Sequence, residues 1–361
     1  MSATIPTEQT VEQTISEIEE IDAAAARAVQ LALDRKTKPR RSLGRLEDLA
    51  CQIAAVRRTA TPAPGEKVIV VMAADHGVAE EGVSAYPAEV TAQMLLNFAR
   101  GGAAINVLAR HAGARLVVVD MGVRVPPPGL EGVRSVRIAP GTRNLANGPA
   151  MTRAQALAAL HAGIAIAGEL AVAQEGVTLI GLGEMGIGNT TAASALTAAF
   201  TGLPPEEVTG HGTGVDQAGL VRKLACIRRG LAANRPDPND ALGTLAALGG
   251  FELAGLAGVV LGAAARRLPV VLDGFPASVA ALVAVRLCPR VQGYLVPSHR
   301  SVEVGHRVVL QALGVRPLLD LDCRLGEGSG AALAMGLVDA ALKLLGEMAT
   351  FDTAGVSDAG A

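Results

Sequence analysis

A run of glycines that contains one acid and two threonines lies between an apolar segment and an alanine-rich segment in the middle of the chain. It occupies residues 181–191, with the sequence GLGEMGIGNTT, and follows the apolar residues 177–180. Glycines let a backbone approach a ligand closely, and the first N–H groups of a following helix are unpaired and attract anions. The pattern therefore predicts an anion cradle, and a phosphorylated small molecule is the first expectation.

Residues 181–186 also satisfy the G-x-G-x-x-G pattern of dinucleotide-binding folds. A dinucleotide site also requires an acid at the end of a second strand, about 20 residues later. The acids at about that distance, Glu206 and Glu207, follow two prolines in a turn and do not match this requirement. A P-loop is excluded because no Gly-Lys-Ser/Thr follows the glycines, so no lysine meets a γ-phosphate. A monophosphate fits better, since N–H groups and hydroxyls hold it unaided. The structural alternative is that the glycines only allow a strand and a helix to pack tightly.

Glu327 is a second candidate for chemistry. It stands between Gly326 and Gly328, just before a helix expected over residues 331–345. Apolar neighbours would raise the pKa of such a carboxyl above about 4.3, which favours general-base work near neutral pH. The alternative is that this acid only favours the N-terminus of the following helix.

Other polar side chains follow apolar runs. Asp75, Asp120 and Asp273 could each bind ribose hydroxyls or, equally, cap the next turn. Tyr86, one of two tyrosines in the chain, follows Ser84 in an expected loop and suggests a stacking side chain.

A metal site is the weaker interpretation of the histidines. His299, Glu303 and His306 have the spacing of one helical face, and His76 ends an apolar run. No H-E-x-x-H motif or aspartate-rich cluster accompanies them, so we expect packing roles and no metal.

The chain must build a frame for these residues, and it opens with a helical segment. Apolar residues recur every three or four positions over residues 10–33, which predicts one amphipathic helix. Ser42 is the expected N-cap of a second helix, and residues 62–65 close the segment.

Apolar, β-rich runs then alternate with alanine-rich helical stretches, a pattern that predicts βαβ units and a parallel sheet covered on both faces. We therefore expect a three-layer α/β fold, with a composite pocket beyond the carboxyl ends of the strands. Residues 126–148 are expected to be irregular and to fold over that pocket. The expected strands are residues 68–73, 116–119, 178–181, 270–272, 293–296 and 317–321.

Composition limits the classes of function. The 361 residues carry 32 basic and 34 acidic side chains and seven aromatic ones, so nucleic acid is not an expected partner. Four scattered cysteines, and an acidic N-terminus without a secretory signal, favour a cytoplasmic location. The longest apolar run, residues 253–265, is shorter than the ~20 residues that span a bilayer. It predicts a buried helix and no membrane span.

These motifs, in this order, resemble the nicotinate-nucleotide:dimethylbenzimidazole phosphoribosyltransferase family, whose members make α-ribazole 5'-phosphate for the lower ligand of cobalamin. The similarity runs from about Lys38 to Leu345. It departs from the family pattern at Arg40-Arg41 and at residues 209–214, the second of which leaves nearby nicotinate contacts open. The matching segments are SLGRLE (42–47), ADHGV (74–78), GEMGIGNTT (183–191), LDGF (272–275) and RLGEGSG (324–330).

The resemblance implies a Rossmann-like α/β domain with a smaller helical domain, assembled as a homodimer. Residues 1–61 would be a helical segment that contributes to the small domain and to dimer contacts, 62–345 the catalytic domain, and 346–361 a flexible tail. The substrates would be nicotinate mononucleotide and 5,6-dimethylbenzimidazole, with neither a cofactor nor a metal. A nucleotide-sensing protein and a dinucleotide oxidoreductase are the alternatives from other classes.

The resemblance also assigns residues to roles. Glu327 would be the general base. The phosphoribosyl and nicotinate site would comprise Glu184, Gly186, Ile187, Gly188, Asn189, Thr190, Lys223, Asp273 and Gly274. The base-binding site would comprise Ser84, Tyr86, Gln93 and Leu325.

Overall fold

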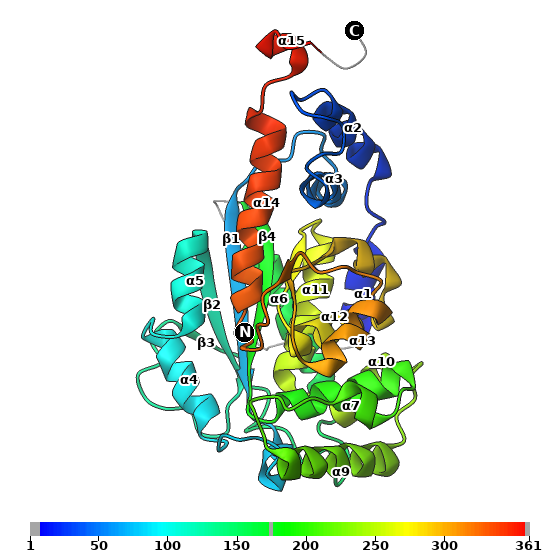
Figure 1. Ribbon diagram of the computed structural model, residues 1–361. Coiled ribbons are helices and arrows are strands. Elements are labelled where there is room, and N and C mark those ends of the chain that lie inside the picture. Colours follow the sequence, from blue (N-terminus) through cyan, green and yellow to red (C-terminus); the bar gives the residue numbers. More distant parts are fainter. Residues whose placement is uncertain (1–7, 173–175, 358–361) are drawn as a thin grey trace.

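A six-stranded parallel sheet forms the centre of the protein in a computed structural model that describes residues 8–172 and 176–357 (Figure 1). The strand order is β3-β2-β1-β4-β5-β6, which is the order of the Rossmann fold. The predicted three-layer α/β class is therefore confirmed. The strands are β1 (Glu66–Ala74), β2 (Ala114–Gly122), β3 (Val133–Ser135), β4 (Val177–Met185), β5 (Val270–Leu272) and β6 (Leu295–Pro297).

Strand β1 is buried on both faces, which explains its uninterrupted apolar sequence. Val68 and Val70 belong to one hydrophobic core, and Ile69 and Val71 belong to a second core. Because side chains alternate along a strand, the two cores lie on opposite faces of the sheet.

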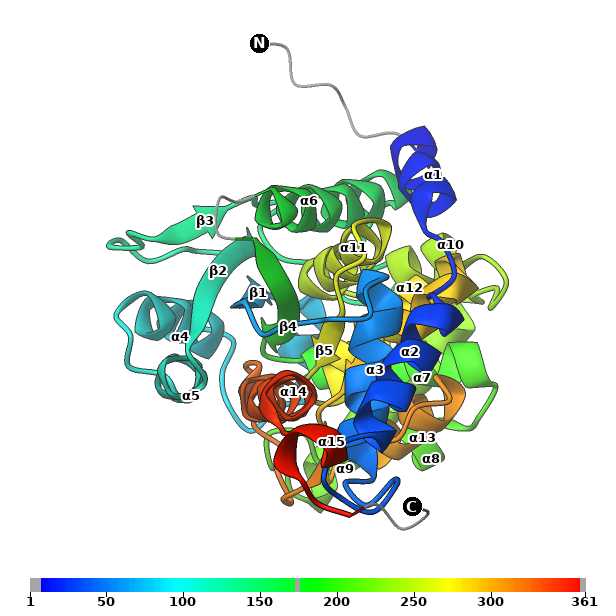
Figure 2. The same cartoon turned by 90° about the horizontal axis from the view of Figure 1, so that it is seen from above.

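Helices cover each face, as Figure 2 shows from above. On one face the two central helices approach closely because both are rich in glycine: a Cβ atom at Gly163 would overlap the backbone of Gly255. That face carries α6 (Arg153–Ala171), α11 (Phe251–Ala265) and α12 (Phe275–Leu287). The other carries α3 (Arg45–Arg57), α4 (Val90–Ala99), α5 (Ala104–Ala112) and α14 (Ser329–Glu347).

Further helices gather beyond the carboxyl ends of the strands, at the lower end of Figure 1. This region also contains a small parallel sheet of β7 (His299–Arg300) and β8 (Leu319–Asp320). Its helices are η1 (Gly77–Glu81), α7 (Asn189–Thr201), α8 (Pro205–Val208), α9 (Gln217–Asn234), α10 (Ala241–Leu248) and α13 (Val304–Ala312). A 3-10 helix, η2 (Pro289–Tyr294), leads into β6.

The N-terminal segment differs from the prediction of one helix over residues 10–33. It forms α1 (Glu8–Glu17) and α2 (Ala23–Asp34). The break arises because Asp22 caps the second helix, its Oδ1 accepting hydrogen bonds from the N–H groups of Ala24 (2.8 Å) and Ala25 (3.2 Å). The three- or four-residue spacing of apolar side chains continues across Asp22, so the sequence pattern did not reveal the break between the two helices.

The expected N-cap at Ser42 was also wrong. Helix α3 begins at Arg45 with Gly44 at the N-cap, and Glu47 Oε1 instead accepts the N–H of Leu43 at 3.1 Å. At the other end of the chain, residues 351–354 form a short helix, α15, inside the segment expected to be a tail. Just before α15, the carbonyl of Met348 accepts a hydrogen bond from Lys36 Nζ at 2.6 Å. Residues 358–361 of the expected tail lie outside the described residues.

Three other expectations need correction. Residue 293 belongs to η2, so the last strand of the sheet starts at Leu295. Residues 319–320 pair with β7 and not with the main sheet. The segment 126–148 is not wholly irregular, since β3 extends the sheet edge. It also covers the end of β1 and not the pocket described below, because Thr142 binds the backbone of Asp75 and Gly77.

Within the part of the chain that the structure describes, two helices, α6 and α14, are long and apolar enough to cross a membrane by length and composition alone. Both pack within the fold, with Leu160 of α6 and Met335 of α14 fully buried in the two cores. Core helices pass the same compositional test, so these two give weak evidence for a span.

Candidate active site

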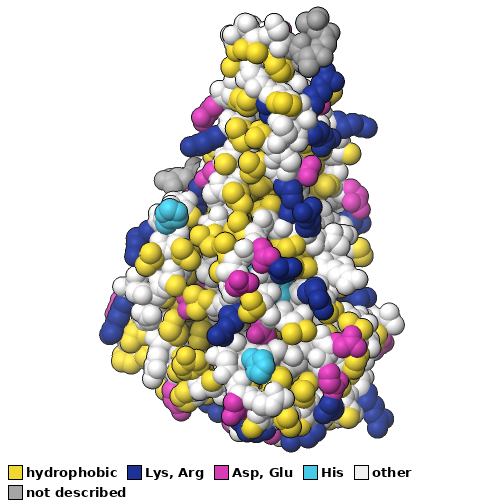
Figure 3. All heavy atoms as spheres, in the orientation of Figure 1, with side chains coloured by type: hydrophobic (Ala, Val, Ile, Leu, Met, Phe, Trp, Pro, Cys, Tyr) yellow, Lys and Arg dark blue, Asp and Glu magenta, His cyan; other side chains and the backbone are white. Residues whose placement is uncertain are grey.

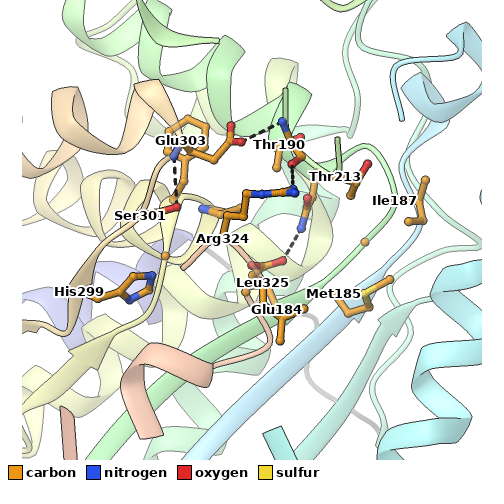
Figure 4. A pocket seen from close by; sticks show the side chains of 17 residues that line it. Glu184, Met185, Ile187, Thr190, Thr213, His299, Ser301, Glu303, Arg324 and Leu325 are labelled. Carbon is orange, nitrogen blue, oxygen red and sulfur yellow. Dashed lines mark hydrogen bonds between the residues drawn. The ribbon is translucent and has the colours of Figure 1, made fainter. Parts of the chain in front are cut away.

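An open cavity lies at the carboxyl ends of β4, β5 and β6, where parallel α/β sheets bind ligands (Figure 4). Two helices, α7 and α12, begin at its wall. Its lining residues are Glu184, Met185, Gly186, Ile187, Asn189, Thr190, Gly212, Thr213, Gly274, Phe275, Pro276, His299, Ser301, Glu303, Arg324, Leu325 and Gly326.

Glu184 stands near the end of β4 and is buried, with its Oε2 accepting a hydrogen bond from the Asn189 side chain. Burial raises the pKa of Glu184 to about 8, and the negative charges of Asp273, Glu252 and Glu327 add to the shift. At neutral pH this carboxyl group is therefore mostly protonated, and it can donate as well as accept a hydrogen bond.

The glycines of the predicted cradle have distinct roles. Gly181 and Gly183 lie inside β4, where a Cβ atom at Gly181 would meet Met335 of α14 at 2.8 Å, so tight packing explains this part of the motif. Gly188 has φ 96° and is the N-cap of α7, a conformation that favours glycine. The N–H of Ile187 donates to Thr91 Oγ1 at 3.0 Å and ties the cradle to α4.

The position of this glycine-rich loop in the sheet differs from that of the glycine-rich turn in dinucleotide-binding folds. In that fold the glycine-rich turn follows the first strand, whereas here it follows β4. The loop therefore matches the general anion cradle better than the dinucleotide motif.

Lys223 of α9 is a buried cation behind the cradle. Its Nζ donates to Thr190 Oγ1 at 2.9 Å and to the carbonyl of Gly210 at 3.2 Å. Burial lowers the pKa of Lys223 to about 8, against the opposing charge of Glu303. The side chain is fully buried, so it acts on the cavity through Thr190.

Asp273 follows β5 and holds the loop that carries Glu327. Its Oδ2 accepts from the N–H of Gly328 at 2.9 Å, and its Oδ1 accepts from the N–H of Gly330 at 2.7 Å. Burial raises the pKa of Asp273 to about 6, against these backbone hydrogen bonds. Of its two predicted roles, ribose binding or backbone capping, the structure shows the second.

Asp120 and Asp75 also bind backbone. Asp120 Oδ1 accepts from the N–H groups of Gly122 and Val123, at 2.9 and 2.8 Å. Asp75 Oδ2 accepts from the N–H of Arg124 at 2.7 Å. Neither aspartate lines the cavity.

Glu327 has a left-handed backbone, with φ 63°, between two glycines that are also left-handed. Its side chain is buried but does not line the cavity of Figure 4; its Oε2 accepts from the N–H of Ile105 at 3.4 Å, in the first turn of α5. Burial raises the pKa of Glu327, and the Ile105 hydrogen bond opposes the shift. The carboxylate therefore faces the first turn of α5.

Of the four residues assigned to the base-binding site, only one lines the cavity. Leu325 lines the cavity and is 57% exposed. Ser84 Oγ lies 3.1 Å from the Oγ1 atom of Thr213, which lines the cavity, so the loop that also carries Tyr86 borders its mouth. Gln93 is exposed on α4, and no described contact joins it to the cavity.

Several lining residues were not predicted as ligand contacts. Thr213 lies in a segment that departs from the family pattern, and Ser301 belongs to no motif. Arg324 begins the matching segment RLGEGSG, but no role was assigned to it. His299 and Glu303 were considered only as metal ligands on one helix face, but His299 is on β7 and Glu303 precedes α13.

The geometry of His306 does not suit a metal. Its Nδ1 accepts from the N–H of Ser301 at 3.0 Å and its Nε2 lies 3.0 Å from Ser278 Oγ, so both ring nitrogens are engaged. Burial lowers the pKa of His306 to about 3. Within residues 8–172 and 176–357, no three His, Cys, Asp or Glu side chains are grouped so as to hold a metal ion.

Comparisons with known proteins agree with this geometry. A family model described as "Phosphoribosyltransferase" matches residues 18–356. A nicotinate-nucleotide–dimethylbenzimidazole phosphoribosyltransferase of Roseiflexus sp. (strain RS-1) is 56% identical, across 96% of this chain and 97% of the relative. The enzyme of the same name from Geobacter metallireducens is 53% identical, across 95% and 97%.

A crystal structure of CobT from Thermus thermophilus superposes with a TM-score of 0.88 at 51% identity, covering 92% of this chain and 99% of that one. A second crystal structure from that organism, of the phosphoribosyltransferase named above, gives a TM-score of 0.87. The chain belongs to the nicotinate-nucleotide–dimethylbenzimidazole phosphoribosyltransferase family.

Proposed function

We propose that the protein transfers the 5-phosphoribosyl group of nicotinate mononucleotide to 5,6-dimethylbenzimidazole. The products are α-ribazole 5'-phosphate and nicotinate, which places the reaction in the assembly of the nucleotide loop of cobalamin. The observation that carries the proposal is the cavity at the end of β4, where a glycine-rich helix start adjoins buried acids in a chain of this family.

The donor belongs in this cavity. The first turn of α7 and the hydroxyl of Thr190, supported by Lys223, offer donors to a phosphate. Glu184, protonated at neutral pH, suits the ribose hydroxyls. Gly274 lies at the start of α12, where a side chain would narrow the cavity.

The nicotinate leaving group needs no metal ion to stabilise its departure. The nicotinate ring of the donor is a cationic pyridinium and leaves as a neutral pyridine nitrogen, so no negative charge develops on the departing atom. Phosphoribosyltransferases that expel pyrophosphate face the opposite problem and hold Mg²⁺ for it.

Glu327 would serve as the general base. As the C1'–N bond lengthens, one benzimidazole nitrogen attacks the opposite face of the ribose, which converts a β-glycoside into an α-glycoside. The other nitrogen must release its proton, and a carboxylate that accepts it keeps positive charge off the ring. A general base contributes roughly 10²- to 10⁴-fold.

The acceptor would lie on the side of the cavity that faces α4 and α5. Ile187 is tied to α4 through Thr91, and Glu327 faces the first turn of α5. Tyr86 and Leu325 are exposed apolar side chains that could cover a flat heterocycle there. Ser84, beside Thr213, and Gln93, exposed on α4, would complete the base-binding site.

We further propose a cytoplasmic homodimer with the N-terminal helices contributing to its contacts. Figure 3 shows apolar side chains gathered over α14 and charges of both signs interspersed elsewhere on that face. A groove between α5 and α14 is lined by the small and apolar residues Ala112, Ala332, Leu333, Gly336 and Ala340, together with His111, Asp339 and Lys343. Sedimentation velocity tests this part directly.

Incubation with nicotinate mononucleotide and 5,6-dimethylbenzimidazole, followed by mass spectrometry, tests the reaction itself. The expected products are α-ribazole 5'-phosphate and nicotinate in equal amounts. Formation of neither product would refute the proposed function, and a shift of protein signals on titration with NAD(P) would favour an oxidoreductase.

A further inference from the structure

A buried acid–histidine pair lies beneath the glycine-rich cradle, and neither of its side chains lines the cavity. His76 follows β1, and Glu252 is in the first turn of α11. Their Nε2 and Oε1 atoms are 2.7 Å apart, and the two side chains are 1% and 0% exposed.

The burial of Glu252 lowers the stability of the fold. Glu252 is the one ionisable residue of α11, a helix buried from Phe251 to Ala264 whose other residues are apolar. A buried carboxylate destabilises a fold unless it is paired, and here a single hydrogen bond compensates it. Among the described residues, Glu252 Oε2 and His76 Nδ1 have no hydrogen-bond partner. Core packing alone would be served better by an apolar pair, so the pair calls for another explanation.

The His76 ring is fitted closely against glycine backbone. A Cβ atom at Gly186 would lie 3.2 Å from His76 Cδ2, and one at Gly188 would lie 3.4 Å from His76 Cβ. On the opposite side, a Cβ atom at Gly250 would lie 2.8 Å from His76 Nε2. The ring thus occupies a slot between the cradle and the turn before α11.

The ring has one orientation because Glu252 fixes it. Without that hydrogen bond an imidazole turns about its side-chain torsions, and the ring edge that meets Gly186 would change. Gly186 has no side chain to fill the resulting gap. The backbone N–H groups at the start of α7 would then lose the alignment on which phosphate binding depends.

We propose that His76, oriented by Glu252, is a positioning residue for the donor site: its ring supports the backbone of residues 186–188 in the conformation that binds the donor phosphate. This inference rests on the proposed function, in which residues 186–190 hold the phosphoribosyl group. It assigns no contact between His76 and the substrate.

Two substitutions of similar size at one position test the orienting bond. Glu252→Gln keeps an acceptor for His76, whereas Glu252→Leu removes it. Donor binding is measured by calorimetric titration of nicotinate mononucleotide, and acceptor binding by titration of 5,6-dimethylbenzimidazole. The Leu variant is expected to raise the donor Kd about tenfold, the Gln variant less than about threefold, and neither to change the acceptor Kd.

Gly250→Ala provides an independent arm if the Leu variant fails to fold. The backbone of Gly250, with φ −145°, accepts alanine, but the new methyl group would overlap the His76 ring and lie 2.6 Å from Glu252 Oε2, so it displaces the pair while both polar groups remain. The donor Kd should again rise about tenfold. Gly346→Ala in α14, where a Cβ atom meets nothing within 4 Å, is the matched control and should bind as wild type.

The inference is overturned if folded Glu252→Leu or Gly250→Ala binds the donor as wild type does. It is also overturned if donor and acceptor affinities fall equally, which indicates general loosening. Failure of the wild-type protein to bind the donor at all would refute the proposed function instead.

Discussion

Glu184→Gln tests the electrostatics of the donor cavity, because it removes one buried acid and little else. The variant keeps an oxygen that can accept from Asn189, as the carboxyl group does. What it removes is a titration between the ordinary pKa of 4.5 and the folded value of about 8. Over that range the folded protein keeps a proton that the unfolded chain has released.

The sign and size of the effect follow from this difference. The folded pKa is raised, so the contribution of Glu184 to stability is complete below pH 4.5 and is lost as the pH rises toward about 8. The free energy of unfolding falls by about 1.4 kcal/mol per pH unit while one proton separates the two states. Between about pH 5.5 and about pH 7.5 the loss is about 3 kcal/mol.

Urea unfolding at several pH values measures this loss. The wild-type protein should lose about 3 kcal/mol more than Glu184→Gln over that range. Because Asp273 interacts electrostatically with Glu184, the difference between the two proteins reports the loss of the Glu184 titration together with its coupling to Asp273. Glu17→Gln, at an exposed position of α1, should follow the wild type. Equal pH dependence in wild type and Glu184→Gln would refute the raised pKa and the protonated carboxyl group inferred from it.

Three further predictions follow from the same site. Asp273→Asn should lower the free energy of unfolding by about 2 kcal/mol in urea, because one amide oxygen cannot accept from both the Gly328 and the Gly330 N–H groups; unchanged stability would contradict the bracing role. Lys223→Met should raise the KM for nicotinate mononucleotide about tenfold in steady-state assays, since Thr190 loses its partner, while Lys343→Met at an exposed position should not. Turnover should survive EDTA because the pyridinium leaves as a neutral ring, and a strict Mg²⁺ requirement would argue for a different donor.

Much of the fold could be predicted because local patterns specify it. Runs such as residues 68–73 are apolar on both faces, and this alone indicates a strand buried in a parallel sheet. The same reasoning placed a buried helix over residues 253–265 and the chemistry at the carboxyl edge. The prediction failed where a signal was short, as at Asp22. The apolar spacing continues across this residue, although its side chain caps a new helix there.

The site was predicted less completely, because much of it depends on contacts between distant segments. The strand-end position of Asp273 suggested ribose binding or capping, but its partners lie 55 and 57 residues further along the chain. Glu303 and His299 suggested one helical face by spacing, yet a strand and a helix start carry them. Glu252 gave no signal as a partner of His76, since 176 residues separate the two.

Base catalysis by Glu327 is the central claim, and single-turnover kinetics of Glu327→Gln measure it most directly. The protein is saturated with nicotinate mononucleotide, mixed with 5,6-dimethylbenzimidazole, and quenched at intervals for quantification of α-ribazole 5'-phosphate. The account predicts a donor Kd equal to that of wild type and a rate of bond formation lower by roughly 10²- to 10⁴-fold. A variant that forms the product at the wild-type rate would contradict it.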